Sequence, residues 1–418
     1  MRLYLRTFQT QLCQPLPDGR GSDALSEPRP SGSGCGRLNG LFHHRPLALL
    51  LLAAALFGQG AKGRIAALQE AANQIGAQNL SAAEEALKPL VAQDDPIALN
   101  LLGVVRIQQG QTAEAETLFR RAIEKGPNLA GPHVNLARLY GKSRAEDAMA
   151  ELATALDLAP DLEQATLLLR EIAAAAAAER ARAGNKEAAL GLMLRAHKVL
   201  PHDPDLLVET ALAAMEAGIY RDAQGFLTEA LSIRAAFPRA IYALARAYLG
   251  DSKGQLAEAE MRKYLALKPD DATAQYGLGY ILMSEQKVEE ARAAFEKSLA
   301  LEPRQTESVF QLGEIASQEG KGELAAEQYA KVLDVDPRHG GALTGLGTLV
   351  YRAGKLDEAL GYLERAVAAA PSYYKAHYYY ALTLKKLGRK EDSDREFQIA
   401  TGLQKRDAPV ARLAEDRK

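Results

Sequence analysis

Aromatic side chains recur at one fixed interval in the second half of the chain. Tyr242, Tyr276, Phe310, Thr344 and Tyr378 are each 34 residues apart, so four of these five positions are aromatic. Aromatic rings offer a large contact area at a low entropic cost, and arginine or lysine beside them can orient a charged partner. This combination is the chemistry of a binding surface.

Charged and further aromatic residues are expected on the same face because helical residues one turn apart lie above one another. The predicted partner-binding groove consists of Tyr242, Arg246, Tyr276, Tyr280, Phe310, Glu314, Arg352, Lys375, Tyr378, Tyr379 and Lys385. In this hypothesis, partner side chains pack against the aromatic rings and the cations select charge. In the alternative, the aromatic ladder only packs neighbouring helices, and the sequence leaves both open.

Signals for catalysis or for a cofactor are poor. The seven histidines are scattered, and none forms a pair with the spacing of metal ligands. Gly347, Gly354 and Lys355 superficially resemble a phosphate-binding loop, but six residues separate the two glycines and Leu356 stands where Ser or Thr is needed. We therefore expect no enzyme activity, no metal and no cofactor.

The elements that must position these residues repeat with the same period. The pattern Leu278-Gly279, Ala291, Phe295, Pro303 returns 34 residues later as Leu312-Gly313, Ala325, Tyr329, Pro337, and again as Leu346-Gly347, Ala359, Leu363, Pro371. Such a period indicates stacked units instead of one globular core. Apolar residues keep helical spacing on both sides of breaks at Gln286, Gly320 and Gly354. Each unit is therefore predicted to be two helices joined by a turn.

The recurring glycine lies in mid-helix, where it is less favourable than alanine by about 1 kcal/mol. We expect a close approach, in which the second helix lies against the first at Gly279 and Ala291 while Phe295 fills the space beside this contact. The proline is expected to end the second helix. These five spaced positions resemble the tetratricopeptide repeat family. The resemblance implies an all-α, right-handed superhelical solenoid whose first helices line a concave face that usually binds other proteins.

About ten such repeats are predicted over residues 62–407. Residues 62–95 form a degenerate first repeat, whereas Leu102-Gly103, Ala115 and Phe119 mark a regular one. The unit of residues 161–201 is seven residues too long, and the excess falls near the alanine run 173–178. Because alanine is the strongest helix former, we predict a lengthened first helix there.

One function of the family is not carried over. Some members grip the terminal carboxylate of a peptide with Lys, Asn and Arg from neighbouring first helices. None of the residues at the corresponding position of this chain is Asn. They are Leu212, Arg246, Tyr280, Glu314, Thr348 and Leu382. The tyrosine-rich end, residues 373–380, either docks an acidic or aromatic-rich peptide or seals the array against the polar tail, residues 408–418.

The first 61 residues differ from the repeats. Residues 1–46 are rich in Pro, Gly, Ser and Arg and are predicted to be disordered. Residues 47–61 contain an apolar run of eleven residues, which is short for a membrane span but suits a secretory signal. This predicts a periplasmic or secreted protein, although more than 40 residues precede the run. An uncleaved membrane anchor, or a fortuitous apolar helix of a cytoplasmic protein, are the alternatives.

The leading functional hypothesis is a non-enzymatic scaffold that binds extended or helical segments of other proteins in its concave groove. The formal net charge of −2 gives no reason to expect nucleic acid as a partner, and membrane contact is expected only through the N-terminal segment. The alternative is an assembly or regulatory subunit of a cell-envelope biosynthesis or secretion complex, with catalysis on a partner. Family analogy alone supports this alternative.

Overall fold

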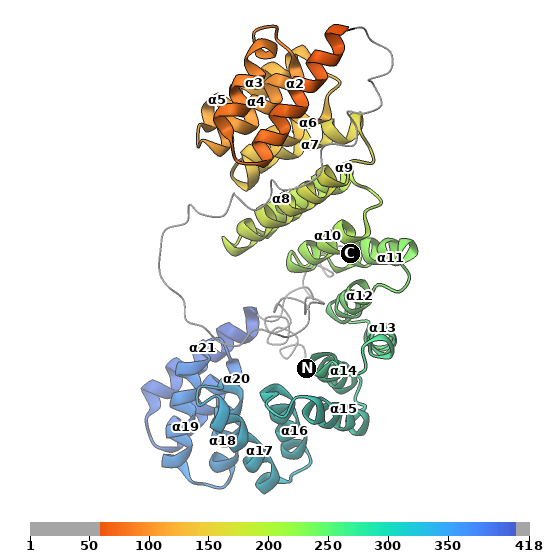
Figure 1. Ribbon diagram of the computed structural model, residues 1–418. Coiled ribbons are helices and arrows are strands. Elements are labelled where there is room, and N and C mark those ends of the chain that lie inside the picture. The colour runs from red at the N-terminus through yellow and green to blue at the C-terminus, as the bar shows by residue number, and fades with distance from the viewer. Residues whose placement is uncertain (1–58, 407–418) are drawn as a thin grey trace, which may run out of the picture. The chain divides into compact units, whose positions relative to one another are not determined.

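A computed structural model describes residues 59–406 of the chain, and all of their regular structure is helical (Figure 1). The segments predicted as a disordered leader (1–46) and as a polar tail (408–418) lie outside the described residues, as does most of the signal-like segment 47–61. The first described helix begins at Gln59 and so includes the last three residues of that segment. Among the described residues, no helix is both long enough and apolar enough to cross a bilayer.

The described residues divide into two compact units between Ala217 and Gly218, and each unit is described by itself. The helices of the N-terminal unit are α2 (Gln59–Gly76), α3 (Leu80–Val91), α4 (Pro96–Gln108), α5 (Thr112–Lys125), α6 (Ala130–Tyr140), the 3-10 helix η1 (Gly141–Arg144), α7 (Ala145–Leu158), α8 (Glu163–Arg182), α9 (Lys186–Val199) and α10 (Pro204–Glu216).

The C-terminal unit continues with eleven further helices. They are α11 (Tyr220–Ile233), α12 (Pro238–Gly250), α13 (Gly254–Leu267), α14 (Ala272–Ser284), α15 (Val288–Leu301), α16 (Thr306–Gln318), α17 (Gly322–Val335), α18 (Gly340–Arg352), α19 (Leu356–Ala369), α20 (Tyr374–Lys386) and α21 (Lys390–Arg406). Within the two units, nine pairs of a first and a second helix pack against each other, where about ten are predicted from the period.

Short turns join the two helices of a pair. Gln286, Gly320 and Gly354, the breaks predicted from the sequence, all have a positive φ, between 64° and 79°. This left-handed conformation costs glycine little, which explains why glycine occupies most of these turns. Two residues after the ends of α15, α17 and α19 stand Pro303, Pro337 and Pro371, so the expectation that proline follows the second helix is confirmed.

The mid-helix glycines lie directly under the large residue of the second helix. A Cβ atom on Gly279 would be 2.6 Å from Cε1 of Phe295, and one on Gly313 would be 2.8 Å from Cε1 of Tyr329. The predicted close approach is therefore present. The nearest atoms belong to the large side chain, which lies over the glycine and not only beside it.

The predicted lengthened helix is confirmed as α8, which has 20 residues where α10 and α12 have 13. Its alanine run contributes to packing, because Ala173, Ala176 and Ala177 are buried in the core of the N-terminal unit. Small side chains thus extend the helix and still allow its neighbours to approach closely.

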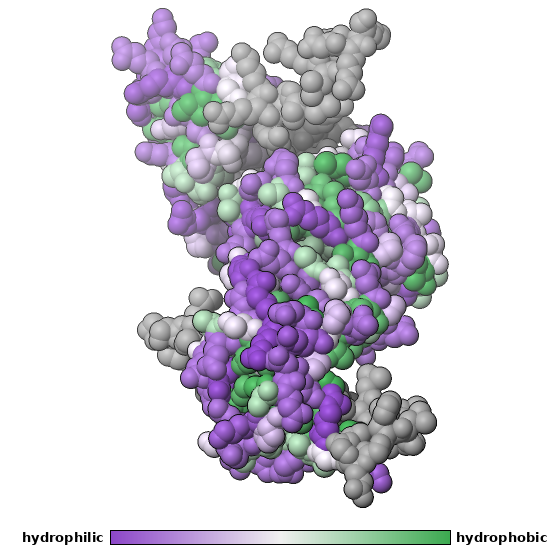
Figure 2. Space-filling view, turned by 90° about the horizontal axis from the view of Figure 1, so that it is seen from above, coloured by the Kyte–Doolittle hydropathy of each residue, from purple (hydrophilic) through white to green (hydrophobic). Residues whose placement is uncertain are grey.

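In the C-terminal unit, the first helices α12, α14, α16 and α18 lie on the inner side of the curve and the second helices α13, α15, α17 and α19 on the outer side (Figure 1). Alanines at the recurring small positions, such as Ala291, Ala325 and Ala359, are fully buried between them. Figure 2 shows a face covered mostly by hydrophilic side chains, with hydrophobic ones in separate patches.

Candidate functional site

The aromatic ladder lies on the predicted helices but is mostly buried. Tyr242 and Tyr276 are 5% exposed and Phe310 is 6% exposed. Each ring packs against an aromatic ring of the following second helix, and the ring centroids of Tyr276 and Phe295 are 5.8 Å apart. Burial raises the pKa of Tyr242 to about 12. Side chains this well covered offer little area to a partner, so their burial favours the packing interpretation.

Tyr280, one turn later on α14, is buried as well. It is 5% exposed, and burial raises its pKa well above the usual range. The reason is geometric. Helical spacing places these residues on one face, but it does not say whether that face meets solvent or the neighbouring helix.

The last aromatic residue of the ladder, on α20, is exposed to solvent. Tyr378 is 42% exposed, and Tyr379 beside it is half-buried. Their rings meet edge to face with centroids 5.5 Å apart, and Tyr379 also meets Tyr351 of α18 at 6.1 Å. Lys386 Nζ lies 4.3 Å from the centroid of the Tyr351 ring. The four residues form an accessible aromatic surface on α18 and α20.

Two predicted groove residues meet across the curve of the unit. Lys375 of α20 pairs with Glu314 of α16, with 3.7 Å between Nζ and Oε2. The other carboxylate oxygen of Glu314 accepts a hydrogen bond from the Tyr329 hydroxyl at 2.6 Å. Burial, reinforced by this carboxylate, raises the pKa of Tyr329. Glu314 is therefore engaged within the chain, and it does not add a free negative charge to the inner side.

Three other predicted cations have no acidic partner among the described residues. Arg352 and Lys385 are exposed at the end of α18 and of α20, next to the aromatic surface. Arg246 of α12 is half-buried, and its Nε atom is shielded from solvent without a hydrogen-bond acceptor. A guanidinium held in this way favours an incoming carboxylate, because the desolvation cost is already met.

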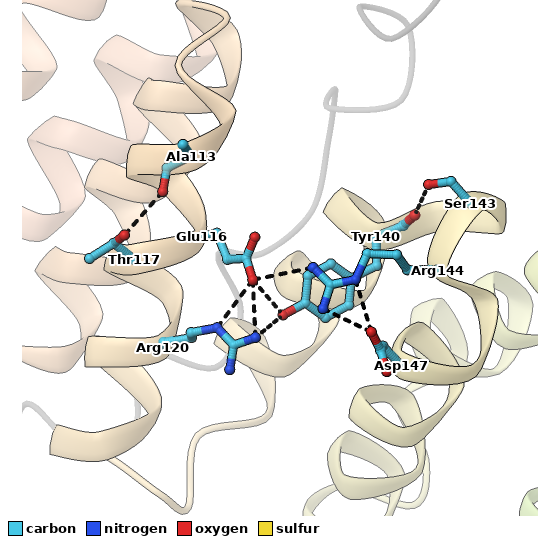
Figure 3. Close-up of polar contacts among 8 residues, drawn as sticks. All are labelled: Ala113, Glu116, Thr117, Arg120, Tyr140, Ser143, Arg144 and Asp147. Carbon is cyan, nitrogen blue, oxygen red and sulfur yellow. Dashed lines mark hydrogen bonds and ion pairs between the residues drawn. The ribbon is translucent and has the colours of Figure 1, made fainter.

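A charged network in the N-terminal unit was not predicted from the sequence. Its charged groups pair with one another (Figure 3). Glu116 of α5 accepts hydrogen bonds from Arg120 at 3.0 Å, from the Tyr140 hydroxyl at 3.0 Å and from Arg144 at 3.3 Å. Arg144 also pairs with Asp147 of α7 at 2.8 Å. Burial favours protonation of Glu116, but these donors outweigh it and lower its pKa. Because every group is paired, we assign the network to helix packing.

Among the described residues, no cluster of three or more His, Cys, Asp or Glu side chains could hold a metal ion. Histidines at these helices instead make structural contacts. His133 Nδ1 lies 2.6 Å from Glu151, His377 Nδ1 lies 2.6 Å from Glu396, and His339 Nδ1 accepts a hydrogen bond from the Ala342 amide at the start of α18.

Comparison with known proteins agrees with this architecture. Residues 68–130, 242–306, 310–374 and 345–398 match the family model of the tetratricopeptide repeat, and together these regions cover more than half of the chain. No match was found among the curated proteins.

Several solved structures are similar to parts of the chain. PilF of Pseudomonas aeruginosa is 21% identical over 51% of this chain and 97% of its own, with a TM-score of 0.42. MamA of Desulfovibrio magneticus RS-1 is 23% identical over 41% of this chain and 96% of its own, with a TM-score of 0.37. YrrB, described as a TPR protein with an unusual peptide-binding site, is 22% identical over 44% of this chain and 95% of its own, with a TM-score of 0.35. At these scores the likenesses carry no conclusion about a ligand of this chain.

Proposed function

The chain belongs to the tetratricopeptide repeat family, and from this premise we propose that it is a non-enzymatic scaffold that binds a segment of another protein. The binding surface we propose comprises Tyr351, Tyr378 and Tyr379 with the cations Arg352 and Lys385, on α18 and α20. We call it the tyrosine surface. Repeat proteins of this kind present extended inner surfaces to their partners.

One observation carries this proposal: Tyr378 is the ladder residue that stays exposed, at 42%, and two unpaired cations lie on the same helices. Aromatic and arginine side chains dominate the energy of protein interfaces, and an exposed tyrosine can bury its ring while its hydroxyl stays hydrogen-bonded. The positive charge beside the rings favours a partner segment that carries acidic residues. Tyr242, Tyr276 and Phe310 then act indirectly, by holding the helices in place.

A charge-selective interaction of this type should depend on salt. Exposed charges steer association and are screened over about 10 Å at 0.1 M ionic strength. Arg246, far along the unit on α12, offers a second anchor for a partner long enough to reach it. The proposal therefore includes an extended or helical acidic segment that follows the inner side of the C-terminal unit.

The experiment compares the full-length protein with two variants as bait for crosslinked partners. Tyr378→Ala with Tyr379→Ala removes the rings, and Arg352→Glu with Lys385→Glu reverses the charge. Both should lose at least tenfold in capture of a partner identified with the wild type, at unchanged helicity. Lys198→Glu, an exposed lysine of α9 without an ion pair among the described residues, is the control and should behave like the wild type.

Equal capture by all four proteins would refute the tyrosine surface. Recovery of a single enzyme in fixed proportion, instead of varied clients, would favour the alternative of an assembly or regulatory subunit in a cell-envelope or secretion complex. We further propose that the protein is exported, which rests only on the apolar run of residues 47–57. Sequencing the N-terminus of the mature protein, together with fractionation of the cells, tests this.

A further inference from the structure

A hollow of about 440 Å³ lies between the second helices α13 and α15, over the first helix α14. Its walls are mostly apolar and include Leu265 of α13 and Leu278 and Leu282 of α14. Arg262 and Glu290 form an ion pair at 2.8 Å between the two second helices that flank it. The hollow is thus built from the outer helices, and it is separate from the tyrosine surface on α18 and α20.

One polar side chain lines this hollow without a partner. Gln275 is 3% exposed, yet its carboxamide makes no hydrogen bond with any described residue. The amide atoms of Gln275 are not among the fully buried polar atoms that lack a partner, so solvent in the hollow reaches them and a ligand there could pair with them. The corresponding positions of neighbouring repeats hold the apolar residues Ile241, Val309 and Leu343.

The last repeat shows what is missing around Gln275. There the corresponding residue is His377, and its Nδ1 atom lies 2.6 Å from Glu396, which follows 19 residues later on α21. Nineteen residues after Gln275 stands Ala294, which is too short to reach the carboxamide. The small side chain therefore leaves the amide unpaired and the space above it open.

We propose that this hollow binds an extended peptide segment of another protein, with one apolar side chain in the hollow and the N–H and C=O groups of one residue paired to Gln275. A carboxamide carries a donor and an acceptor side by side, which matches the C=O and N–H groups of an extended backbone. The volume lies within the usual range of about 300 to 1,000 Å³ for ligand sites. Hydrogen bonding to the backbone and burial of one side chain together define the ligand class.

The charge at the hollow adds a preference for sequence. Lys297 of α15 lines it, is exposed and has no acidic partner among the described residues. Arg262 already pairs with Glu290, so the unpaired positive charge comes from Lys297. An acidic residue next to the apolar one in the bound segment would meet this charge. The favoured ligand is therefore an extended segment with a leucine-like residue beside an aspartate or glutamate.

The test uses the full-length protein with labelled leucine methyl groups and the acetylated, amidated hexapeptide Ser-Gly-Leu-Asp-Gly-Ser. Titration should shift the methyl signals of Leu265, Leu278 and Leu282. Gln275→Leu, which copies the residue of other repeats, should weaken binding roughly tenfold, because two hydrogen bonds are lost. Ala294→Leu should abolish it by filling the hollow. Val335→Ala, at an exposed position at the end of α17 outside both surfaces, is the matched control and should bind like the wild type.

Two further probes decide what the hollow recognises. A peptide N-methylated at the leucine amide lacks the N–H group and should bind roughly tenfold more weakly than the parent peptide. If free leucine amide binds as tightly as the hexapeptide, or if Gln275→Leu leaves the affinity unchanged, a peptide site is refuted. Methyl shifts that survive in Ala294→Leu would likewise refute it. The methyl signals of Leu265, Leu278 and Leu282 report on the hollow and not on the tyrosine surface, so the two proposals can fail separately.

Discussion

The repeat of α14 and α15 and the repeat of α20 and α21 share one backbone design but are open on opposite sides. In the first, Tyr276 is 5% exposed on the inner side, while Gln275 lines an open hollow between the outer helices. In the second, Tyr378 is 42% exposed, while His377 is closed off by its contact with Glu396. The inner residue is thus covered and the outer one open in the first repeat, and the reverse holds in the last repeat.

This difference teaches that the second helix decides what a first-helix residue can do. Both first helices carry a polar residue at this position, Gln275 in one and His377 in the other, and the residue 19 further on supplies or withholds a partner. Glu396 satisfies His377, whereas Ala294 leaves Gln275 unpaired. Because each repeat touches only its neighbours, such local changes create a site without disturbing the array.

The largest effect is expected where the second helix covers the first. Gly279→Leu should lower the free energy of unfolding by about 3 kcal/mol, because even a Cβ atom there would be 2.6 Å from the ring of Phe295. Hydrogen exchange of the α14 and α15 amides measures this loss locally. Phe295→Ala in the same background should recover part of the loss, since it removes the clash. An unchanged exchange rate for Gly279→Leu would disprove the packing account.

The next effect concerns the closed side of the last repeat. Glu396→Ala should lower the free energy of unfolding by about 1 to 2 kcal/mol, since it leaves a buried imidazole nitrogen without its partner. Urea denaturation followed by hydrogen exchange in α20 measures it. Glu396→Gln keeps an acceptor oxygen and should cost less. A loss from Gln as large as that from Ala would mean that charge, and not the hydrogen bond, matters at this contact.

Much of the fold could be predicted from the sequence, because each repeat packs mainly within its own stretch of chain. The spacing of Gly279, Phe295 and Pro303 identified the helix pair, and the alanine run identified the long helix α8. The spacing could not predict which atom contacts each glycine. That depends on the rotamer of the large side chain, and a small rotation moves a ring from beside the glycine to above it.

The candidate sites were harder to predict, because exposure depends on what covers a residue. Tyr242 and Tyr378 occupy the same position in their repeats, yet one is 5% and the other 42% exposed. No described helix follows α21 to pack on the last repeat. The hollow had a readable signal, since Gln275 is polar where Ile241, Val309 and Leu343 are apolar, and Ala294 cannot reach it. Comparing repeats with one another, and not only with an average pattern, would have found it.

The same substitution should have opposite signs in the two repeats. Gln275→Leu should raise the free energy of unfolding by about 0.5 to 1 kcal/mol, because it puts an apolar side chain at a position that is only 3% exposed and where the amide has no partner in the protein. His377→Leu should lower it instead, because Glu396 then loses its partner. Parallel urea titrations of the two variants measure both signs. A loss in both repeats would mean that Gln275 is satisfied and that the hollow is closed.

The smallest effect compares two glycines in the same pair of repeats. Gly402 lies in α21, and a Cβ atom there would meet nothing within 4 Å, in contrast to Gly279. Gly402→Ala should therefore raise the local free energy of unfolding by about 0.5 kcal/mol, because alanine loses less backbone entropy in a helix. Slower hydrogen exchange of the α21 amides would record this gain. Faster exchange would show that α21 needs the glycine for a contact. The difference between Gly279 and Gly402 would then not depend on whether a side chain of the second helix covers the glycine.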